Sequence, residues 1–118
     1  MARAFKNVAV AAARAVADKK AEQVTLLHVT GISPLTDYML IATANSKPHM
    51  ETLEEETRKA VKAFHLHAVR QAKPSSDSWR ILDYGGLIVH LMTAEAREFY
   101  ALDRLYGEGK KVKWEARG

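Results

Sequence analysis

Three side chains that can take part in chemistry, Asp83, Tyr84 and His90, lie in the otherwise apolar stretch WRILDYGGLIVHLM at residues 79–92. An aspartate that orients a histidine can make that histidine a general base. If the Gly-Gly pair between them forms a two-residue hairpin loop, Asp83 lies diagonally from His90, at roughly 7 Å between their backbones. The stretch therefore raises two alternatives, a small catalytic site and a surface that another macromolecule recognises.

A nucleophile to accompany the aspartate and the histidine is not evident. The serines all lie in turn or helix-cap contexts, and no GxSxG motif accompanies them. A histidine that is hydrogen-bonded within or beside a sheet is far commoner than a catalytic one. We therefore expect no catalytic residue in this chain.

The other histidines do not form a metal-binding signature. His65 and His67 share a face only in a strand, and a third ligand is not apparent. The chain has neither a GxxxxGK[ST] loop nor a GxGxxG, and no cysteine that could bind zinc or form a disulfide. The sequence therefore predicts neither a metal site nor a cofactor.

The hairpin predicted around Tyr84, Gly85 and Gly86 has two apolar faces, and both need covering. One face carries Arg80, Leu82, Tyr84, Leu87, Val89 and Leu91. The other carries Trp79, Ile81, Asp83, Ile88, His90 and Met92. Helices of the domain can cover one face, and a partner protein could cover part of the other, because interface centres favour aromatic side chains beside a few polar ones.

Length and charge describe one domain with basic ends. The chain has 118 residues and a net charge of +4, with no run of the ~18 apolar residues that a membrane span needs. No signal peptide is apparent, so we expect a cytoplasmic protein that does not enter a membrane. Residues 1–20 and 109–118 are both rich in lysine and arginine. These ends would attract a polyanion such as RNA, or they are solvated surface charge.

The order of elements predicts an α/β or α+β fold, a single domain in which helices cover a mixed sheet. Hydrophobic spacing, turn residues and caps predict one domain over residues 1–107, followed by a basic tail over 108–118. The predicted helices span residues 3–19, 45–64 and 93–106. The predicted strands lie at 24–30, 37–45, near 67–72, on the two sides of the hairpin, and at 112–114.

Caps and apolar stripes support the last two helices. Ser46 is a candidate N-cap with Pro48 in the first turn, and Thr93 is a candidate N-cap with Gly107 as the C-cap. The inner face of the middle helix is predicted to carry Met50, Leu53, Thr57, Ala60, Val61 and Phe64. One side of the last helix is predicted to carry Phe99, Leu102, Leu105 and Tyr106.

Three motifs, taken in order, resemble the ribosomal silencing factor family, also called the Iojap-like family. They are D-Y-x-x-I-A-T-x-N-S at residues 37–46, W-x-x-L-D-Y-G followed by V-H at 79–90, and R-x-F-Y-x-L at 97–102. The resemblance covers nearly the whole chain up to Gly107. Three motifs in the family's order make a chance similarity improbable.

The resemblance implies a translation factor that is not an enzyme and needs no cofactor. Such a factor binds the large ribosomal subunit through ribosomal protein L-fourteen, blocks joining of the small subunit, and can act in large-subunit biogenesis. The family fold resembles a nucleotidyltransferase core without the catalytic carboxylates, and members often form homodimers when free. The basic ends add an expected contact with ribosomal RNA at the periphery. The alternative is a nucleotidyltransferase-like enzyme or nucleotide-binding regulator that uses Asp37, Asp83 and His90.

The resemblance also implies which residues face the partner. They are Trp79, Leu82, Asp83, Tyr84 and Gly85, with His90, Tyr100, Leu105 and Tyr106 as neighbours. The hairpin register places Trp79 and Tyr84 on opposite faces, so either a bulge shifts the register or one of the two belongs to the core. The chain departs from the family at Gly86 and near His28, where an acidic residue is usual, which makes this surface less acidic.

Overall fold

The computed structural model describes residues 5–66, 70–71 and 78–115. The helices are α1 (Lys6–Asp18), α2 (Lys47–Lys62), α3 (Ala94–Tyr100) and α4 (Leu102–Leu105). The strands are β1 (Glu22–His28), β2 (Tyr38–Ala44), β3 (Arg70–Gln71), β4 (Trp79–Asp83), β5 (Leu87–Thr93) and β6 (Lys110–Lys111). Within these residues the strands form one sheet in the order β3-β4-β5-β2-β1-β6.

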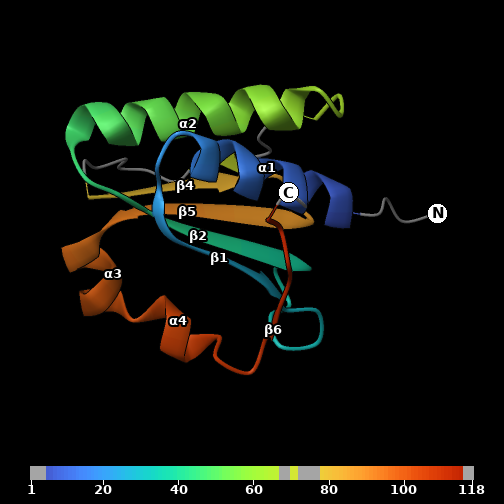
Figure 1. The fold of residues 1–118 in the computed structure, drawn as a ribbon. Coiled ribbons are helices and arrows are strands. Elements are labelled where there is room, and N and C mark those ends of the chain that lie inside the picture. Colours follow the sequence, from blue (N-terminus) through green and yellow to red (C-terminus); the bar gives the residue numbers. More distant parts are fainter. Residues whose placement is uncertain (1–4, 67–69, 72–77, 116–118) are drawn as a thin grey trace.

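The sheet is mixed, and helices lie on both of its faces (Figure 1). Strands β2 and β5 are parallel at its centre, and every other neighbouring pair is antiparallel. The long helices α1 and α2 cover one face, whereas the short helices α3 and α4 lie on the other. The fold class predicted from the order of elements, a single α/β domain with a mixed sheet, is confirmed.

The two faces carry two separate hydrophobic clusters. The cluster under α1 and α2 includes Leu40, Leu82, Val89 and Leu91 from the sheet. The smaller cluster under α3 and α4 includes Leu27, Met39, Ile41 and Met92. Side chains that alternate along each strand therefore serve two cores, which explains why the hairpin is apolar on both faces.

The predicted cap of α2 is confirmed, and so are four of the six residues of its predicted inner face; Ala60 is partly exposed, and Phe64 packs against the cluster under α1 and α2 from just beyond the helix end. The Ser46 hydroxyl accepts the backbone N–H of His49 over 3.1 Å, and Pro48 lies in the first turn. Met50, Leu53, Thr57 and Val61 are buried. The helix ends at Lys62, two residues before the predicted end. No helix among residues 5–66 and 78–115 is both long and apolar enough to cross a membrane.

The hairpin between β4 and β5 has the predicted register. Ile81 pairs with His90 and Asp83 with Ile88, and Tyr84 donates its backbone N–H to the carbonyl of Leu87 over 2.8 Å. The loop therefore introduces no register shift. Of the two explanations left open by the sequence, the structure supports the one in which Tyr84 belongs to the core, where its exposed fraction is 5%.

The single helix predicted over residues 93–106 is wrong, because the structure divides it at Ala101. Thr93 is the N-cap as expected, and its hydroxyl accepts the N–H of Ala96 over 3.2 Å. Ala101 then takes the left-handed conformation, with φ 51°, and serves as the C-cap of α3 and the N-cap of α4. The final cap is Tyr106, one residue before the predicted Gly107.

The predicted strands near both sheet edges form shorter elements. Strand β3 contains only Arg70 and Gln71 of the predicted 67–72 segment, of which 67–69 and 72 lie outside the described residues. Strand β6 begins two residues before the predicted 112–114 strand, and the N–H of Val112 continues its pairing with the carbonyl of Leu26 over 2.8 Å. The sheet therefore extends into the segment predicted as a basic tail.

Candidate docking surface

Trp79 and His90 lie side by side on the face of the sheet that α3 and α4 partly cover. The indole Nε1–H of Trp79 donates to Nδ1 of His90 over 3.0 Å. Because Nδ1 accepts this bond, the ring proton of the neutral imidazole lies on Nε2. Burial lowers the pKa of His90 from 6.5 to about 4, so the ring is neutral near pH 7. A neutral histidine of this kind supports its neighbour and is no cationic binding group.

An aromatic surface extends from this pair onto α3. The ring of Tyr100 contacts that of Trp79 with centroids 4.5 Å apart, and the ring of Phe99 packs edge-on against Tyr100 at 4.9 Å. The side chain of Phe99 is 80% exposed and that of Tyr100 49% exposed. We call Trp79, Phe99 and Tyr100 the aromatic surface. Large exposed aromatic groups in mutual contact are typical of protein interfaces.

The residues that the family resemblance assigns to the partner surface lie on two faces. Trp79, His90 and Tyr100 are in contact on the α3 side, as described above. Leu82 and Tyr84 are buried on the opposite side, in the cluster under α1 and α2. Burial also raises the pKa of Tyr84 above its usual value. The structure thus brings the first three together and separates them from Leu82 and Tyr84 by the thickness of the sheet.

Asp83 and Gly85 form the tip of the hairpin. The carboxylate Oδ1 of Asp83 accepts the backbone N–H of Gly85 over 2.8 Å, which closes an Asx-type turn. Gly85 has φ 86°, a conformation that favours glycine. Asp83 lies two and four residues along β4 from Ile81 and Trp79, so all three side chains share the α3 face.

Leu105 and Tyr106 come from α4 and the residue that ends it. The side chain of Leu105 is 67% exposed, whereas Tyr106 packs against the smaller hydrophobic cluster. Trp79 packs against the same cluster. Leu105 therefore adds an exposed apolar group on the same side of the sheet as the aromatic surface, and Tyr106 anchors the segment that carries it.

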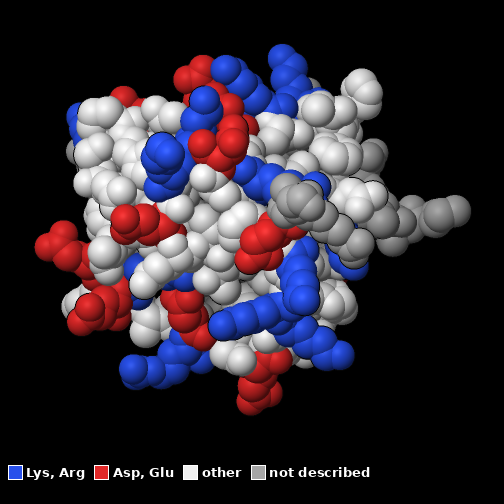
Figure 2. Space-filling model, in the orientation of Figure 1, with Lys and Arg blue, Asp and Glu red and all other residues white. Residues whose placement is uncertain are grey.

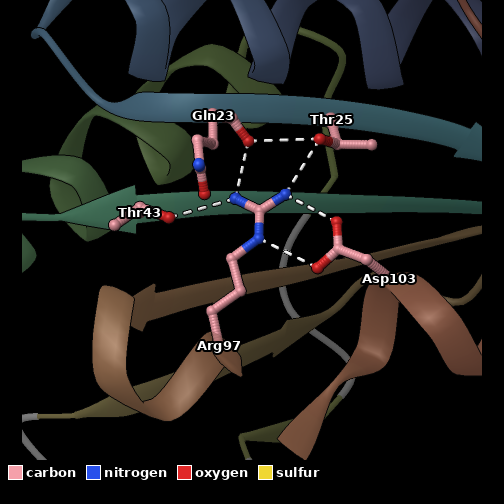
Figure 3. Close-up of polar contacts among 5 residues, drawn as sticks. All are labelled: Gln23, Thr25, Thr43, Arg97 and Asp103. Atoms are coloured by element: carbon pink, nitrogen blue, oxygen red, sulfur yellow. Dashed lines mark hydrogen bonds and ion pairs between the residues drawn. The ribbon is translucent and has the colours of Figure 1, made fainter. Parts of the chain in front are cut away.

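Arg97 is buried at the base of α3, with 7% of its surface exposed (Figure 3). Its Nε and Nη2 donate to the two carboxylate oxygens of Asp103 over 3.0 and 2.8 Å. Its Nη1 donates to the carbonyl of Gln23 over 2.6 Å and to Thr43 Oγ1 over 3.0 Å, and Nη2 donates to Thr25 Oγ1 over 2.9 Å. The hydrogen bond from Arg97 lowers the pKa of Asp103.

The residues of the alternative enzyme hypothesis make separate structural contacts. Asp37 Oδ1 accepts the hydroxyl of Thr30 over 3.0 Å, Asp83 closes the hairpin turn, and His90 accepts from Trp79. Asp83 and His90 are diagonal neighbours, as the register predicted, but each has its own partner. In the part of the chain that the structure describes, no group of three or more acidic or histidine side chains could hold a metal ion.

Basic side chains gather over β6 and the segment after it (Figure 2). Lys110, Lys111 and Lys113 are exposed there, and Arg14 Nε donates to the carbonyl of Trp114 over 2.6 Å. Acidic groups lie among the basic ones. The segment predicted as a basic tail therefore contacts α1 through Trp114. Its surface carries both charges and is mainly positive.

Two residues of the site were not identified in these roles from the sequence. The sequence predicts that Phe99 shares one side of a single helix with Leu102, Leu105 and Tyr106, but the helix breaks at Ala101 and Phe99 is exposed. Arg97 is the first residue of the R-x-F-Y-x-L motif, and it is buried. Its environment could not be predicted, because its acceptors on β1 and β2 come from residues more than 50 positions earlier.

Comparison with known proteins gives consistent matches in sequence and in structure. A family model described as "Ribosomal silencing factor during starvation" matches residues 2–117. A protein of Halalkalibacterium halodurans named ribosomal silencing factor RsfS is 33% identical over 104 residues, which cover 88% of this chain and 89% of the relative. One of the same name from Treponema pallidum is 35% identical over 105 residues, 85% of this chain and 90% of the relative.

Solved structures of similar proteins have the same fold. A crystal structure from Chromobacterium violaceum superimposes with a TM-score of 0.82 at 23% identity, over 98% of this chain and 95% of that one. A crystal structure from Bacillus halodurans gives a TM-score of 0.72 at 31% identity, over 87% of this chain and 93% of that one.

Proposed function

Because this chain belongs to the ribosomal silencing factor family, we propose that it binds the large ribosomal subunit through ribosomal protein L-fourteen and so blocks joining of the small subunit. The family establishes the general role, that of a translation regulator that associates with ribosomes. The match over residues 2–117 is the observation that carries the proposal. The proposal adds three things to this role: ribosomal protein L-fourteen as the partner, the residues that contact it, and the block of small-subunit joining.

The aromatic surface, together with Leu105, is the proposed centre of the contact. Phe99 and Leu105 are the most exposed large apolar side chains of α3 and α4, and burying them against a partner would remove apolar area from water. Trp79 and Tyr100 are already held in place by each other, so they lose little conformational freedom on binding. A rigid aromatic pair with exposed apolar neighbours has the features of a binding hot spot.

The hairpin tip adds a polar edge to the proposed contact. Asp83 lies on the α3 face of β4 and would pair with a basic group of the partner. Gly85 keeps the tip narrow, and Tyr106 and His90 support the surface from beneath. Leu82 and Tyr84 would act from the core, by holding the hairpin against α1 and α2. In this proposal the family motif W-x-x-L-D-Y-G therefore contains contact residues and core residues in alternation.

The proposed mechanism is steric. A contact of roughly 1,200 to 2,000 Å² in total would hold the protein where the small subunit has to approach. No covalent step or cofactor is required, because occupancy of the site is the whole effect. This binding would repress translation and could also act while the large subunit matures in the cytoplasm. The free protein would form a homodimer through an overlapping surface.

A second, weaker contact with ribosomal RNA is proposed for the basic surface over β6. Lys110, Lys111 and Lys113 are exposed and lie within four consecutive residues. Lysine contacts with phosphates release counterions, so this contribution would weaken as the salt concentration rises. It would strengthen attachment to the subunit without selecting the site.

Co-sedimentation with separated ribosomal subunits, followed by a subunit-joining assay, tests the proposal. We expect the protein to sediment with the large subunit but not the small one, and to reduce joining in proportion to its occupancy. If it ignores the large subunit, or if joining proceeds normally on fully occupied large subunits, the proposal is wrong. Binding of nucleotide with a divalent metal would instead support the enzyme alternative.

A further inference from the structure

We infer that Arg97 is the positioning residue of the docking surface, which holds α3 and α4 at the one angle that presents Phe99, Tyr100 and Leu105 together. The inference rests on the proposed function, because it concerns the surface proposed there for the large subunit. Arg97 is buried, so it would act on the docking surface by positioning other side chains and not by touching the partner. Figure 3 shows the contacts on which it depends.

The guanidinium of Arg97 joins α4 to the two paired strands β1 and β2. All of its N–H groups have acceptors, on β1, on β2 and on α4. A planar guanidinium can satisfy acceptors in several fixed directions at once, whereas a lysine ammonium on a flexible stem cannot. Because every donor is used within the protein, Arg97 is not available to bind a ligand in the pocket between Gln23, Ala94 and Arg104 that it lines.

Two local irregularities of the backbone serve this contact. Strand β1 has a register shift between Glu22 and Thr25, and Gln23 within it has φ 49°. A bulge frees backbone groups from the ladder, and here the carbonyl of Gln23 points at Arg97. On the other side, Ala101 has φ 51°, an unfavourable conformation for alanine that turns the chain so that Asp103 reaches the same guanidinium.

The position of the exposed side chains follows from this junction. Phe99 and Tyr100 lie two and three residues after Arg97, and Leu105 lies two residues after Asp103. Arg97 and Asp103 are joined by two hydrogen bonds, so the two short helices cannot turn independently about Ala101. Helices of seven and four residues are too short to be stable alone, so their orientation depends on such tertiary contacts.

The test compares Arg97→Lys with two controls in co-sedimentation with large subunits. Arg104→Lys makes the same substitution at an exposed position of α4, and Val61→Ala removes buried volume under α2 on the far side of the sheet. Unfolding in urea identifies conditions in which all variants are folded. We expect Arg97→Lys to raise the Kd for the large subunit by about tenfold or more, a loss typical of a displaced contact, with both controls near wild type.

A second readout follows the surface without the ribosome. In a Trp114→Phe background, Trp79 is the sole tryptophan, and its fluorescence reports its contact with Tyr100. Arg97→Lys should shift this emission, whereas Val61→Ala should not. If Arg97→Lys does not fold, Asp103→Asn, which removes the charge from an exposed carboxylate, replaces it in both assays.

The outcomes separate this inference from the proposed function. If the wild type binds the large subunit and the folded Arg97→Lys protein binds equally well, the positioning role is wrong. A Val61→Ala protein that loses as much affinity as Arg97→Lys would also overturn it, because stability alone would explain the loss. If the wild type does not bind the large subunit, the proposed function fails, and the Trp79 emission still decides whether Arg97 positions α3.

Discussion

Trp79 donates its indole N–H to Nδ1 of His90 over 3.0 Å. This bond requires a neutral imidazole with its proton on Nε2, because a protonated imidazole has no nitrogen left to accept it. The histidine is 7% exposed, and burial lowers its pKa to about 4. The relationship connects the central aromatic side chain of the proposed docking surface to the protonation state of a group in the sheet.

The first prediction concerns pH. Between pH 6.5 and pH 4 the unfolded chain takes up a proton at His90 and the folded protein does not, so the free energy of unfolding falls as the pH is lowered through this window. The loss in the free energy of unfolding due to His90 reaches up to about 3 kcal/mol at the acid end of the window. Above pH 6.5 His90 adds no further pH dependence to the stability. Urea unfolding of wild type and His90→Gln across the window measures it. Equal slopes for the two proteins would contradict the prediction.

The second prediction concerns Phe99. Phe99→Ser removes an exposed ring, so stability should change by less than about 1 kcal/mol, whereas affinity for the large subunit should fall by about tenfold or more. Leu35→Ser is the matched control, because Leu35 is 73% exposed but lies in the loop between β1 and β2. Co-sedimentation measures both, and an equal effect of the two substitutions would show that the contact is elsewhere.

The third prediction separates the two aromatic residues of the W-x-x-L-D-Y-G motif. Tyr84→Ala empties a buried site under α1 and α2 and should lower the free energy of unfolding by about 3 to 5 kcal/mol. The molecules that remain folded should bind large subunits as wild type does. Trp79→Ala should instead weaken binding. The test is the affinity of each variant for large subunits, corrected for the fraction of folded protein. A binding defect of folded Tyr84→Ala would show that Tyr84 takes part in the contact.

The fourth prediction concerns the departure from the family at Gly86. A Cβ atom built on Gly86 would overlap the ring of Phe5, so Gly86→Ala should cost about 1 to 3 kcal/mol of stability. Phe5→Ala opens that space, and the double substitution should cost less than the two single ones combined. Urea unfolding of the four proteins measures the coupling. Additive effects would mean that the Phe5 ring is not the source of the cost.

The hairpin could be predicted from the sequence because its determinants are local. A Gly-Gly loop sets which residues of β4 and β5 face each other, and strict alternation then assigns Trp79 and Tyr84 to different faces. The cap at Ser46 and the stripe of α2 are local in the same sense. The family motifs alone could not say which members of W-x-x-L-D-Y-G face outward, since that depends on which face α1 and α2 cover.

The end of the chain could not be predicted in this way. The residues between Thr93 and Tyr106 contain neither glycine nor proline, and their spacing suits one continuous helix. The break at Ala101 accompanies the contacts of Arg97 with Gln23, Thr25 and Thr43, which lie far away in the sequence. Local spacing therefore could not predict it. The exposure of Phe99 follows from that break, so the error in the helix and the error in the site have one cause.

The contacts of Arg97 also bear on the order in which the protein becomes active after synthesis. Its acceptors on β1 and β2 lie 74, 72 and 54 residues earlier in the chain, and Asp103 lies six residues later. Contacts between such distant residues form slowly and late in folding. A nascent chain that ends before α4 has β1 to β5 and α3 but lacks Asp103, so its junction at Arg97 is incomplete. Incomplete chains would then have no organised docking surface, and they would not compete with finished protein for the ribosomes that make them.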